Sequence, residues 1–495
     1  MAISLGQMLE ESCRQWPEHL ALLQEDISLT YADLDRAVNS FGNRMQAAGL
    51  QKGDKIALML PNGVEFVVAY FAIQKIGAVA VTLNVLSTAY ELKHLLGNSE
   101  ARGVITTTLL APKLAEIKND LPLCTFLFLH DEQNPAQSPF REAMQSGPFT
   151  LAMPEIIGAD PAVIIYTSGL TGQPVGAVLT HDNLLGQSFL LKTICGTTDQ
   201  DRGLAVIPFF HSFGAVVNML CVIRVGASVV LMDSFSVDAI FSAIETQRIT
   251  FIAAVPRLFI GMVMQAEDKE FDHSSLQLCI SGGAAMPVEF FPRFEARFGI
   301  KISEGYGLTE ASPVCAFTRP AGIHKPGSVG PTVPDVEARV VDDAGQELPM
   351  GEVGELLIRG SNVMQGYYHD KAATAAVIRG GWLYTGDLAR IDGDGHIFLT
   401  GLKKRMIITS GYNVYPREVE MVLNLHPAVQ ASLALGKPNL LRGEVVKALI
   451  VKHPGSEVDS KELVRHCRQY LSSYKVPRDI EFVEQLPVHG STGSP

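Results

Sequence analysis

The sequence lacks the features that mark secreted or membrane-spanning chains. Its seven cysteines are scattered singly, with no CxxC pair and an odd total, which argues against a disulfide framework and favours reduced thiols in the cytoplasm. No segment reaches about 18 uninterrupted apolar residues, and the first residues contain no basic stretch followed by an apolar core. We therefore expect a cytoplasmic protein without a transmembrane segment. Peripheral contact with a membrane surface is compatible with this composition.

Positive charge is also in short supply. The chain has 40 Lys and Arg against 52 Asp and Glu, a net charge of -12, which disfavours a nucleic-acid backbone or an anionic membrane as the main partner. A hydrophobic share of 47% with 19% charged residues excludes disorder. Internal repeats and coiled-coil heptads are missing as well. Because 495 residues are too many for one core, we expect at least two domains.

Helical and strand patterns alternate through most of the chain, which predicts an α/β fold of layered subdomains with largely parallel sheets. From about residue 325 the strands become shorter and glycine-rich, which indicates a β-rich subdomain. A boundary near 401–405 divides a large domain, 1–400, from a small α+β domain, 401–495. The expected helices are 31–48, 64–76, 416–425 and 460–471; the expected strands are 55–59, 78–83, 162–166, 203–207, 228–231, 251–255, 276–281, 338–341, 354–358, 432–435 and 446–451.

The most informative stretch is YTSGLTGQPVG, residues 166–176, which follows a buried strand. Phosphate groups favour short donors without side-chain bulk, and five of the six residues at 167–172 are Gly, Ser or Thr. The spacing does not match GxxxxGK[ST], which rules out a Walker A motif here and removes most of the case for a P-loop NTPase. An ordinary polar connection after a strand is the alternative, although so many small polar residues are unusual for one.

Two further clusters carry suitable chemistry. In SEGYGLTE, residues 303–310, an aromatic ring, a hydroxyl and a carboxylate could stack a base, touch a phosphate and hold Mg²⁺. In YTGD, residues 384–387, an Asp in a tight loop could bind both hydroxyls of a ribose. Each has a structural alternative, because a Tyr between glycines often packs on the core and an Asp after Gly is a common turn or N-cap residue. Loops after parallel strands meet at one edge, so we expect one crevice to be shared by the loops that begin at Thr167, Pro208, Pro256 and Gly282.

Four motifs in this order and spacing, YTSGLTGQPVG, GYGLTE, YTGD and GLKKRMIITSGYNVYPREVE, resemble the adenylate-forming (AMP-binding) acyl-CoA synthetase family. The likeness extends from LTYADL and GDKIALMLPN to the small terminal domain. It implies a two-step ligase: a carboxylate attacks the α-phosphate of Mg-ATP to give acyl-AMP and pyrophosphate, and the thiolate of coenzyme A then displaces AMP to give a thioester. ATP, Mg²⁺, coenzyme A and a small carboxylic acid are the implied ligands.

The resemblance also assigns roles to residues. The loop from Thr167 to Gly172 would hold the β- and γ-phosphates, Thr309 would meet the α-phosphate, Glu310 the metal, and Asp387 the ribose. The ring of Tyr306 would stack on adenine. The catalytic set is then Thr167, Thr171, His211, Thr309, Glu310 and Lys404, the last at the hinge of the small domain. The nucleotide set is Ser168, Gly169, Gly172, Gly283, Ala284, Glu304, Gly305, Tyr306, Gly307 and Asp387, and the pantetheine tunnel would be lined by Ser410, Gly411 and Tyr412.

An aromatic-rich segment around His211, PFFHSFG, matches the family's junction between the acyl pocket and the coenzyme A entrance, although a lone histidine is more often structural. With no basic residue placed for a second carboxylate, the resemblance and the apolar neighbours favour a medium- or long-chain monocarboxylic fatty acid. The expected pocket residues are Phe209, Phe210, Phe213, Val216, Val255, Ala284 and Ala285.

Three positions depart from the family's pattern. Val175 replaces the lysine of the phosphate loop, Leu402 replaces the arginine after Gly401, and Ser494 stands where the lysine of a terminal LPxxxTGK run would be. We therefore expect a slow first half-reaction and faster thioester formation from supplied acyl-AMP. Two alternatives are an acyl-AMP ligase that feeds a carrier protein, and a degenerate synthetase that binds nucleotide or acyl ligand without turnover.

Overall fold

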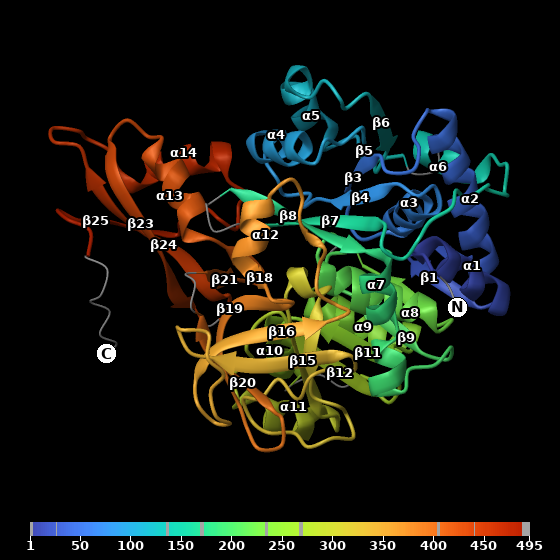
Figure 1. Ribbon diagram of the computed structural model, residues 1–495. Helices are drawn as coiled ribbons and strands as arrows, with labels where there is room; N and C mark the ends of the chain where they lie inside the picture. Colours follow the sequence, from blue (N-terminus) through green and yellow to red (C-terminus); the bar gives the residue numbers. More distant parts are fainter. Residues whose placement is uncertain are drawn as a thin grey trace.

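The computed structural model describes residues 3–25, 27–134, 138–168, 173–232, 236–266, 271–402, 406–439 and 441–487. It confirms the α/β class, with a large N-terminal domain of layered sheets and helices and a smaller C-terminal domain beside it (Figure 1). Within these ranges no helix combines the length and apolarity needed to cross a bilayer. All seven cysteines are free thiols.

The first sheet has seven strands in the order β17-β8-β7-β4-β3-β5-β6, and its five strands from β7 to β6 run parallel. Strands such as β4 are buried on both faces, which is why they consist of consecutive apolar residues. The strands are β3 (Lys55–Met59), β4 (Val79–Thr82), β5 (Gly103–Thr107), β6 (Phe126–His130), β7 (Pro161–Ser168), β8 (Pro174–Thr180) and β17 (Gly366–Tyr367).

The second sheet has eight strands in the order β14-β13-β12-β11-β9-β10-β1-β2, antiparallel only at its two ends. The strand expected at 162–166 is not part of it, because β7 pairs with β4. Of the four loops expected to share one crevice, the loop that begins at Thr167 therefore follows a strand of the first sheet, whereas the other three follow strands of the second. The strands are β1 (Leu20–Gln24), β2 (Ile27–Thr30), β9 (Arg202–Ala205), β10 (Ser228–Leu231), β11 (Phe251–Ala254), β12 (Leu278–Gly282), β13 (Ile302–Gly307) and β14 (Val314–Phe317).

Helix α3 (Val64–Lys75) lies between these two sheets and contacts strands of both. All twelve of its residues are buried, which explains why its sequence is apolar on every side instead of along one stripe. The other helices of the large domain are α1 (Leu5–Gln15), α2 (Tyr31–Ala47), α4 (Ala89–Asn98), α5 (Ala111–Ile117), η1 (Lys118–Asp120), α6 (Pro139–Gln145), α7 (His181–Ser188), η3 (Leu191–Cys195), η4 (Gly214–Leu220), α8 (Cys221–Arg224), α9 (Val237–Gln247), α10 (Pro256–Ala266), α11 (Phe290–Phe298), η5 (Thr309–Ala311) and α12 (Lys371–Val377).

A third, antiparallel sheet occupies the region expected to be β-rich, drawn in orange in Figure 1. The expected boundary near residue 401 falls at the end of its last strand. The strands are β15 (Val336–Val341), β16 (Gly354–Gly360), β18 (Ile378–Arg379), β19 (Trp382–Ile391) and β20 (Ile397–Leu402).

The small domain has its own sheet and its own hydrophobic core, and helix α14 (Ser460–Tyr470) packs against α4 of the large domain. Its pattern of strand, helix, strands and helix matches the sequence expectation. The remaining elements are β21 (Ile407–Thr409), β22 (Tyr412–Val414), α13 (Pro416–Asn424), β23 (Val429–Asn439), β24 (Gly443–Lys452) and β25 (Asp479–Phe482).

Candidate active site

Residues from both large sheets meet at one carboxylate, that of Glu310. Thr167 is near the end of β7, and its hydroxyl donates to Glu310 Oε1 at 3.1 Å. Tyr367 on β17 donates its phenolic hydroxyl to the same oxygen at 2.8 Å. Burial and the nearby carboxylate raise the pKa of Tyr367, so the phenol keeps its proton. Tyr367 was not anticipated, because a Tyr after Gly in a two-residue strand carries no chemical signal in the sequence.

The surroundings of Glu310 fit a metal ion that arrives with a nucleotide. Mg²⁺ is usually held by one or two carboxylates together with substrate phosphates and water. Glu310 supplies one carboxylate. The described residues contain no group of three or more His, Cys, Asp or Glu that could hold a metal ion by themselves. The donor set therefore suits a Mg-ATP complex rather than a protein cage.

The hydroxyl of Thr309 lies 3.4 Å from that of Ser212, which follows His211 in the loop after β9. Next to it, Gly307 is required by close packing, because a Cβ there would lie 1.9 Å from the carbonyl oxygen of Pro313. Thr309 and Glu310 therefore lie in the short helix η5, directly after the carboxyl end of β13 in the second sheet.

Tyr306 and Asp387 contact each other directly, the phenolic hydroxyl donating to Asp387 Oδ2. Tyr306 is buried at the end of β13. Asp387 does not lie in a tight loop, as the sequence had suggested, but within the long strand β19. Gly386 has a φ of 77°, and the pairing of β16 with β19 shifts register in this stretch, so a bulge turns the carboxylate toward β13.

Glu304 is a buried carboxylate on β13, 8% exposed. Burial raises its pKa to about 7, against a smaller opposing effect of the Met286 backbone N–H that it accepts. Gly305 pairs with Gly282 across the ladder, and Gly283 follows in an exposed left-handed turn with Ala284 beside it. The predicted adenine segments 282–284 and 304–306 are therefore neighbours.

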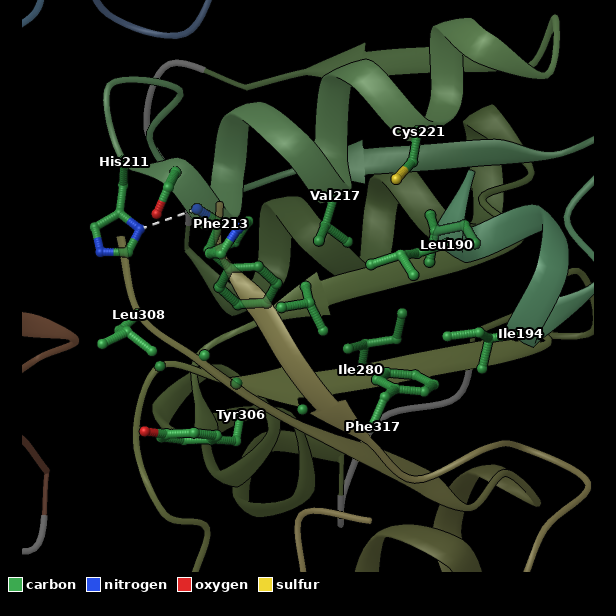
Figure 2. Close-up of a pocket in the computed structure, with 18 of the residues that line it drawn as sticks. Leu190, Ile194, His211, Phe213, Val217, Cys221, Ile280, Tyr306, Leu308 and Phe317 are labelled. Carbon is green, nitrogen blue, oxygen red and sulfur yellow. Dashed lines mark hydrogen bonds between the residues drawn. The ribbon is translucent and has the colours of Figure 1, made fainter. Parts of the chain in front are cut away.

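An apolar cavity, partly open to solvent, extends from this site into the second sheet. His211 and Leu308 lie at one end, and Leu190, Ile194 and Cys221 lie at the other (Figure 2). The lining residues are Leu190, Leu191, Ile194, Cys195, His211, Ser212, Phe213, Val217, Cys221, Ile280, Gly282, Gly283, Gly305, Tyr306, Gly307, Leu308, Pro313, Val314 and Phe317.

One of the seven residues expected for the acyl pocket lines this cavity. Phe213 lines the cavity, whereas Phe209 and Val216 are fully buried in the main core. The other four expected residues, Phe210, Val255, Ala284 and Ala285, are not part of the lining. Four of the lining residues, Leu191, Ile194, Cys195 and Val217, come from the π-helical turns η3 and η4, whose wider winding cannot be distinguished from an α-helix by the spacing of apolar residues.

His211 is neutral at physiological pH, because burial lowers its pKa to about 4. Its Nδ1 accepts the backbone N–H of Phe213 at 3.2 Å. The ring proton must therefore be on Nε2, and the neutral imidazole can donate one hydrogen bond without bringing a charge into the apolar cavity.

Two of the three predicted tunnel residues of the small domain, Ser410 and Gly411, contact the large domain. Ser410 has a φ of 53°, and its hydroxyl accepts from Arg257 of the large domain and from Arg442, at 3.4 and 3.5 Å. A Cβ on Gly411 would lie 2.8 Å from Val255 Cγ1, so this backbone packs against the large domain. Tyr412 stacks on Tyr474 with 4.5 Å between ring centroids.

Several predicted residues lie outside the described ranges: Gly169, Thr171, Gly172, Lys404 and Ser494. For Ser168 and Leu402 only the backbone, at strand ends, is described. Val175 pairs with Thr167 across β7 and β8. Because paired residues of an antiparallel ladder project from the same face, Val175 shares the face from which Thr167 reaches Glu310.

The sequence of the chain is similar to family profiles and to individual proteins of known activity. The profile of the AMP-binding enzyme family matches residues 9–368, and that of the AMP-binding enzyme C-terminal domain matches residues 418–492. The chain is 34% identical to a long-chain-fatty-acid–CoA ligase of Bacillus subtilis over 98% of this chain and 92% of that protein. It is 35% identical to a feruloyl-CoA synthase of Amycolatopsis over 98% and 96%.

Two solved structures resemble the whole chain to different degrees. A double mutant of o-succinylbenzoate CoA synthetase from Bacillus subtilis, bound with the product analogue OSB-NCoA, has a TM-score of 0.87 at 28% identity, covering 98% of this chain and 96% of that one. ATP-bound MatB from Rhodopseudomonas palustris has a TM-score of 0.77 at 29% identity and the same coverage.

Proposed function

Because the chain belongs to the AMP-binding enzyme family of adenylate-forming acyl-CoA ligases, we propose that it activates a medium- or long-chain fatty acid as acyl-AMP and transfers the acyl group to coenzyme A. The apolar cavity beside Thr309 and Glu310 is the observation that carries this proposal. The reduced cysteines and the dependence on ATP and coenzyme A favour the cytoplasm as the place of reaction.

The cavity favours a chain with one carboxylate. No Lys, Arg, Asp or Glu is among the residues that line it, so a second carboxylate or an amine on the substrate would be buried without a partner. The polar groups of His211 and Ser212 lie toward the end near Thr309. A fatty acid would place its carboxylate at that end and its alkyl chain toward Cys221.

In the first half-reaction a carboxylate oxygen forms a bond to the α-phosphorus, and the bond from that phosphorus to the bridging oxygen of pyrophosphate breaks. The hydroxyls of Thr309 and Thr167 donate to phosphate oxygens, which offsets the repulsion between two anions. Glu310 would hold Mg²⁺, whose charge stabilises the triphosphate. Asp387 would bind the ribose hydroxyls, and Tyr306 would stack on adenine while holding Asp387 in position.

In the second half-reaction the coenzyme A thiolate attacks the acyl carbon, and AMP leaves with the bonding electrons. Ser410 and Gly411 already contact Arg257 and Val255 of the large domain, and Tyr412 stacks on Tyr474 of the small domain. Among the described residues, Arg257 and Arg442 pair with no carboxylate and meet only at the Ser410 hydroxyl. Two guanidinium groups without a counter-charge complement the phosphates of coenzyme A.

A panel of acids tests the proposal. Purified protein is given Mg-ATP, coenzyme A and saturated acids of increasing chain length, ferulic acid, or no acid, and both pyrophosphate and thioester are measured. We expect thioester with fatty acids, little with ferulic acid, and none for Glu310→Gln. A preference for ferulic acid would contradict the proposed fatty acid substrate and indicate an aryl acid instead.

The same assay separates the other classes of protein. Thioester formed on a phosphopantetheinyl carrier protein but not on coenzyme A would identify an acyl-AMP ligase. If no acid releases pyrophosphate and supplied acyl-AMP gives no thioester, while nucleotide still binds, the chain is a binding protein and the proposal is wrong.

A further inference from the structure

A buried charge cluster joins the two domains and is not used by either half-reaction above. Lys475 Nζ donates to Glu91 Oε1 and to Glu418 Oε1, each at 2.7 Å. Glu91 lies in α4 of the large domain. Glu418 and Lys475 both belong to the small domain, Glu418 in α13 and Lys475 in the segment after α14. Ser472 adds a hydrogen bond to Glu91 Oε2 at 2.6 Å. One ammonium therefore links carboxylates from both domains.

The cluster is buried, with Glu91 and Glu418 each 7% exposed and Lys475 8% exposed. Burial disfavours the charge of Glu91, yet Lys475 and Ser472 hold its pKa below the usual range. Burial raises the pKa of Glu418, whose Oε2 has no hydrogen-bond partner in the described part of the chain. Buried charges are tolerated only when they are paired, so loss of one partner is costly.

The contacts of the cluster depend on the orientation of the small domain. If that domain turned away from α4, Lys475 would keep Glu418 but lose Glu91, and Glu91 would lose Ser472. Thr88 would also lose its hydrogen bond to the carbonyl oxygen of Tyr470. The full set of contacts therefore exists only in the arrangement described here.

The cluster also connects to the predicted pantetheine tunnel. Lys475 directly follows Tyr474, whose ring stacks on that of Tyr412. Tyr412 is next to Gly411, which packs against Val255 of the large domain. Over the whole chain, the TM-score is 0.87 to the solved structure with a coenzyme A product analogue and 0.77 to the ATP-bound one.

We propose that Glu91, Lys475 and Glu418 form an interdomain clamp that positions the small domain, and through Tyr474 the ring of Tyr412, for thioester formation and not for adenylation. This inference rests on the proposed two-step reaction. Lys475 and Glu91 are positioning residues, because they act through Tyr412 and the domain orientation and touch no substrate.

Two substitutions test the clamp in the full-length protein. Glu91→Gln removes the charge, and glutamine can still serve in the capping box that Glu91 forms with Thr88 at the start of α4. Lys475→Met removes the ammonium at similar length. Lys93→Met is the matched control, because Lys93 lies on the same helix and pairs with Asp120 at an exposed site.

Each clamp variant should slow thioester formation from synthetic acyl-AMP and coenzyme A by about tenfold or more, as expected when one partner of a buried pair is lost. Acid-dependent exchange of pyrophosphate into ATP should stay within about twofold of the wild type. The double variant should be no slower than the worse single variant, because both remove one interaction. Equal losses in both half-reactions, or the same loss in the control, would overturn the proposal.

Hydrogen exchange of the ligand-free protein gives a readout that needs no substrate. Lys475→Met should deprotect amides of α4, which lies in the other domain, and Glu91→Gln should deprotect residues 471–476, while the amides of β3 stay protected. Unchanged protection across the interface refutes the clamp. A wild type that makes no thioester from any acid or acyl-AMP refutes the proposed function instead, and the exchange measurement still decides the clamp.

Discussion

At the scale of single residues, Glu304 is the site group whose protonation should be visible in solution. Its pKa is raised from 4.5 to about 7 by burial. Because the folded-state pKa is above the unfolded one, the folded protein binds the extra proton between about pH 4.5 and 7, and stability falls as pH rises through this window. Above it, the buried charge costs about 3 kcal/mol at most, from 1.36 kcal/mol per pKa unit.

Glu304→Gln should therefore be more stable than the wild type at pH 8 and nearly equal to it at pH 4.5. Glutamine retains an oxygen to accept the Met286 N–H and carries no charge. Thermal unfolding of both proteins over pH 4.5 to 8.5 measures the difference. A difference that does not grow with pH would show that the carboxylate is solvated in the folded protein.

The sequence predicts individual site residues only where they belong to a recognisable motif. The motifs predict Thr167, Thr309, Glu310, Tyr306 and Asp387 as site residues. The structure pairs Thr167 with Glu310 and Tyr306 with Asp387, and it places the hydroxyl of Thr309 beside that of Ser212. The partner Tyr367 could not be predicted, because the contact depends on how β17 pairs with β8, far away in sequence. Their catalytic roles stay predictions.

At the scale of elements, local signals predicted strands and helices more accurately than their partners. The strand at Ser228–Leu231 was predicted with its observed bounds, because a buried parallel strand is a short apolar run between turns. Its neighbour β1 comes from the first 25 residues, and no local pattern specifies that pairing. The π-helical turn η4 could not be predicted for a related reason: hydrogen-bond spacing within a buried helix leaves little trace in the sequence.

The cavity wall leads to a prediction about chain length. Cys221 begins α8 at the inner end of the cavity, and its thiol donates to the carbonyl oxygen of Gln187. Cys221→Phe would add a ring at this end, so the longest accepted acid should become shorter, with a higher KM for longer acids and little change for short ones. Cys221→Ser is the control of equal size. If both variants shift the preference alike, loss of the thiol and not added volume is the cause.

At the scale of the whole molecule, we expect the two half-reactions to have unequal rates. The small domain lies with Gly411 against Val255 and with Lys475 bound to Glu91 of α4, the arrangement that we propose for the second step. The first step must instead stabilise pyrophosphate as a leaving group, and the position at which the family carries a lysine for this purpose is Val175. Thioester formation should therefore be faster from supplied acyl-AMP than from acid and ATP.

Val175→Lys tests whether the missing cation causes this imbalance. The cross-strand pair with Thr167 places the new ammonium on the face that meets Glu310, close to where the β- and γ-phosphates are expected. By analogy with single electrostatic contacts in other active sites, acid-dependent pyrophosphate exchange should rise by about ten- to a hundredfold. The rate from acyl-AMP and coenzyme A should not change. Val175→Met controls for side-chain length, because methionine is about as long as lysine and carries no charge. An equal gain in the methionine variant would contradict the electrostatic explanation, and so would equal wild-type rates from acyl-AMP and from acid with ATP.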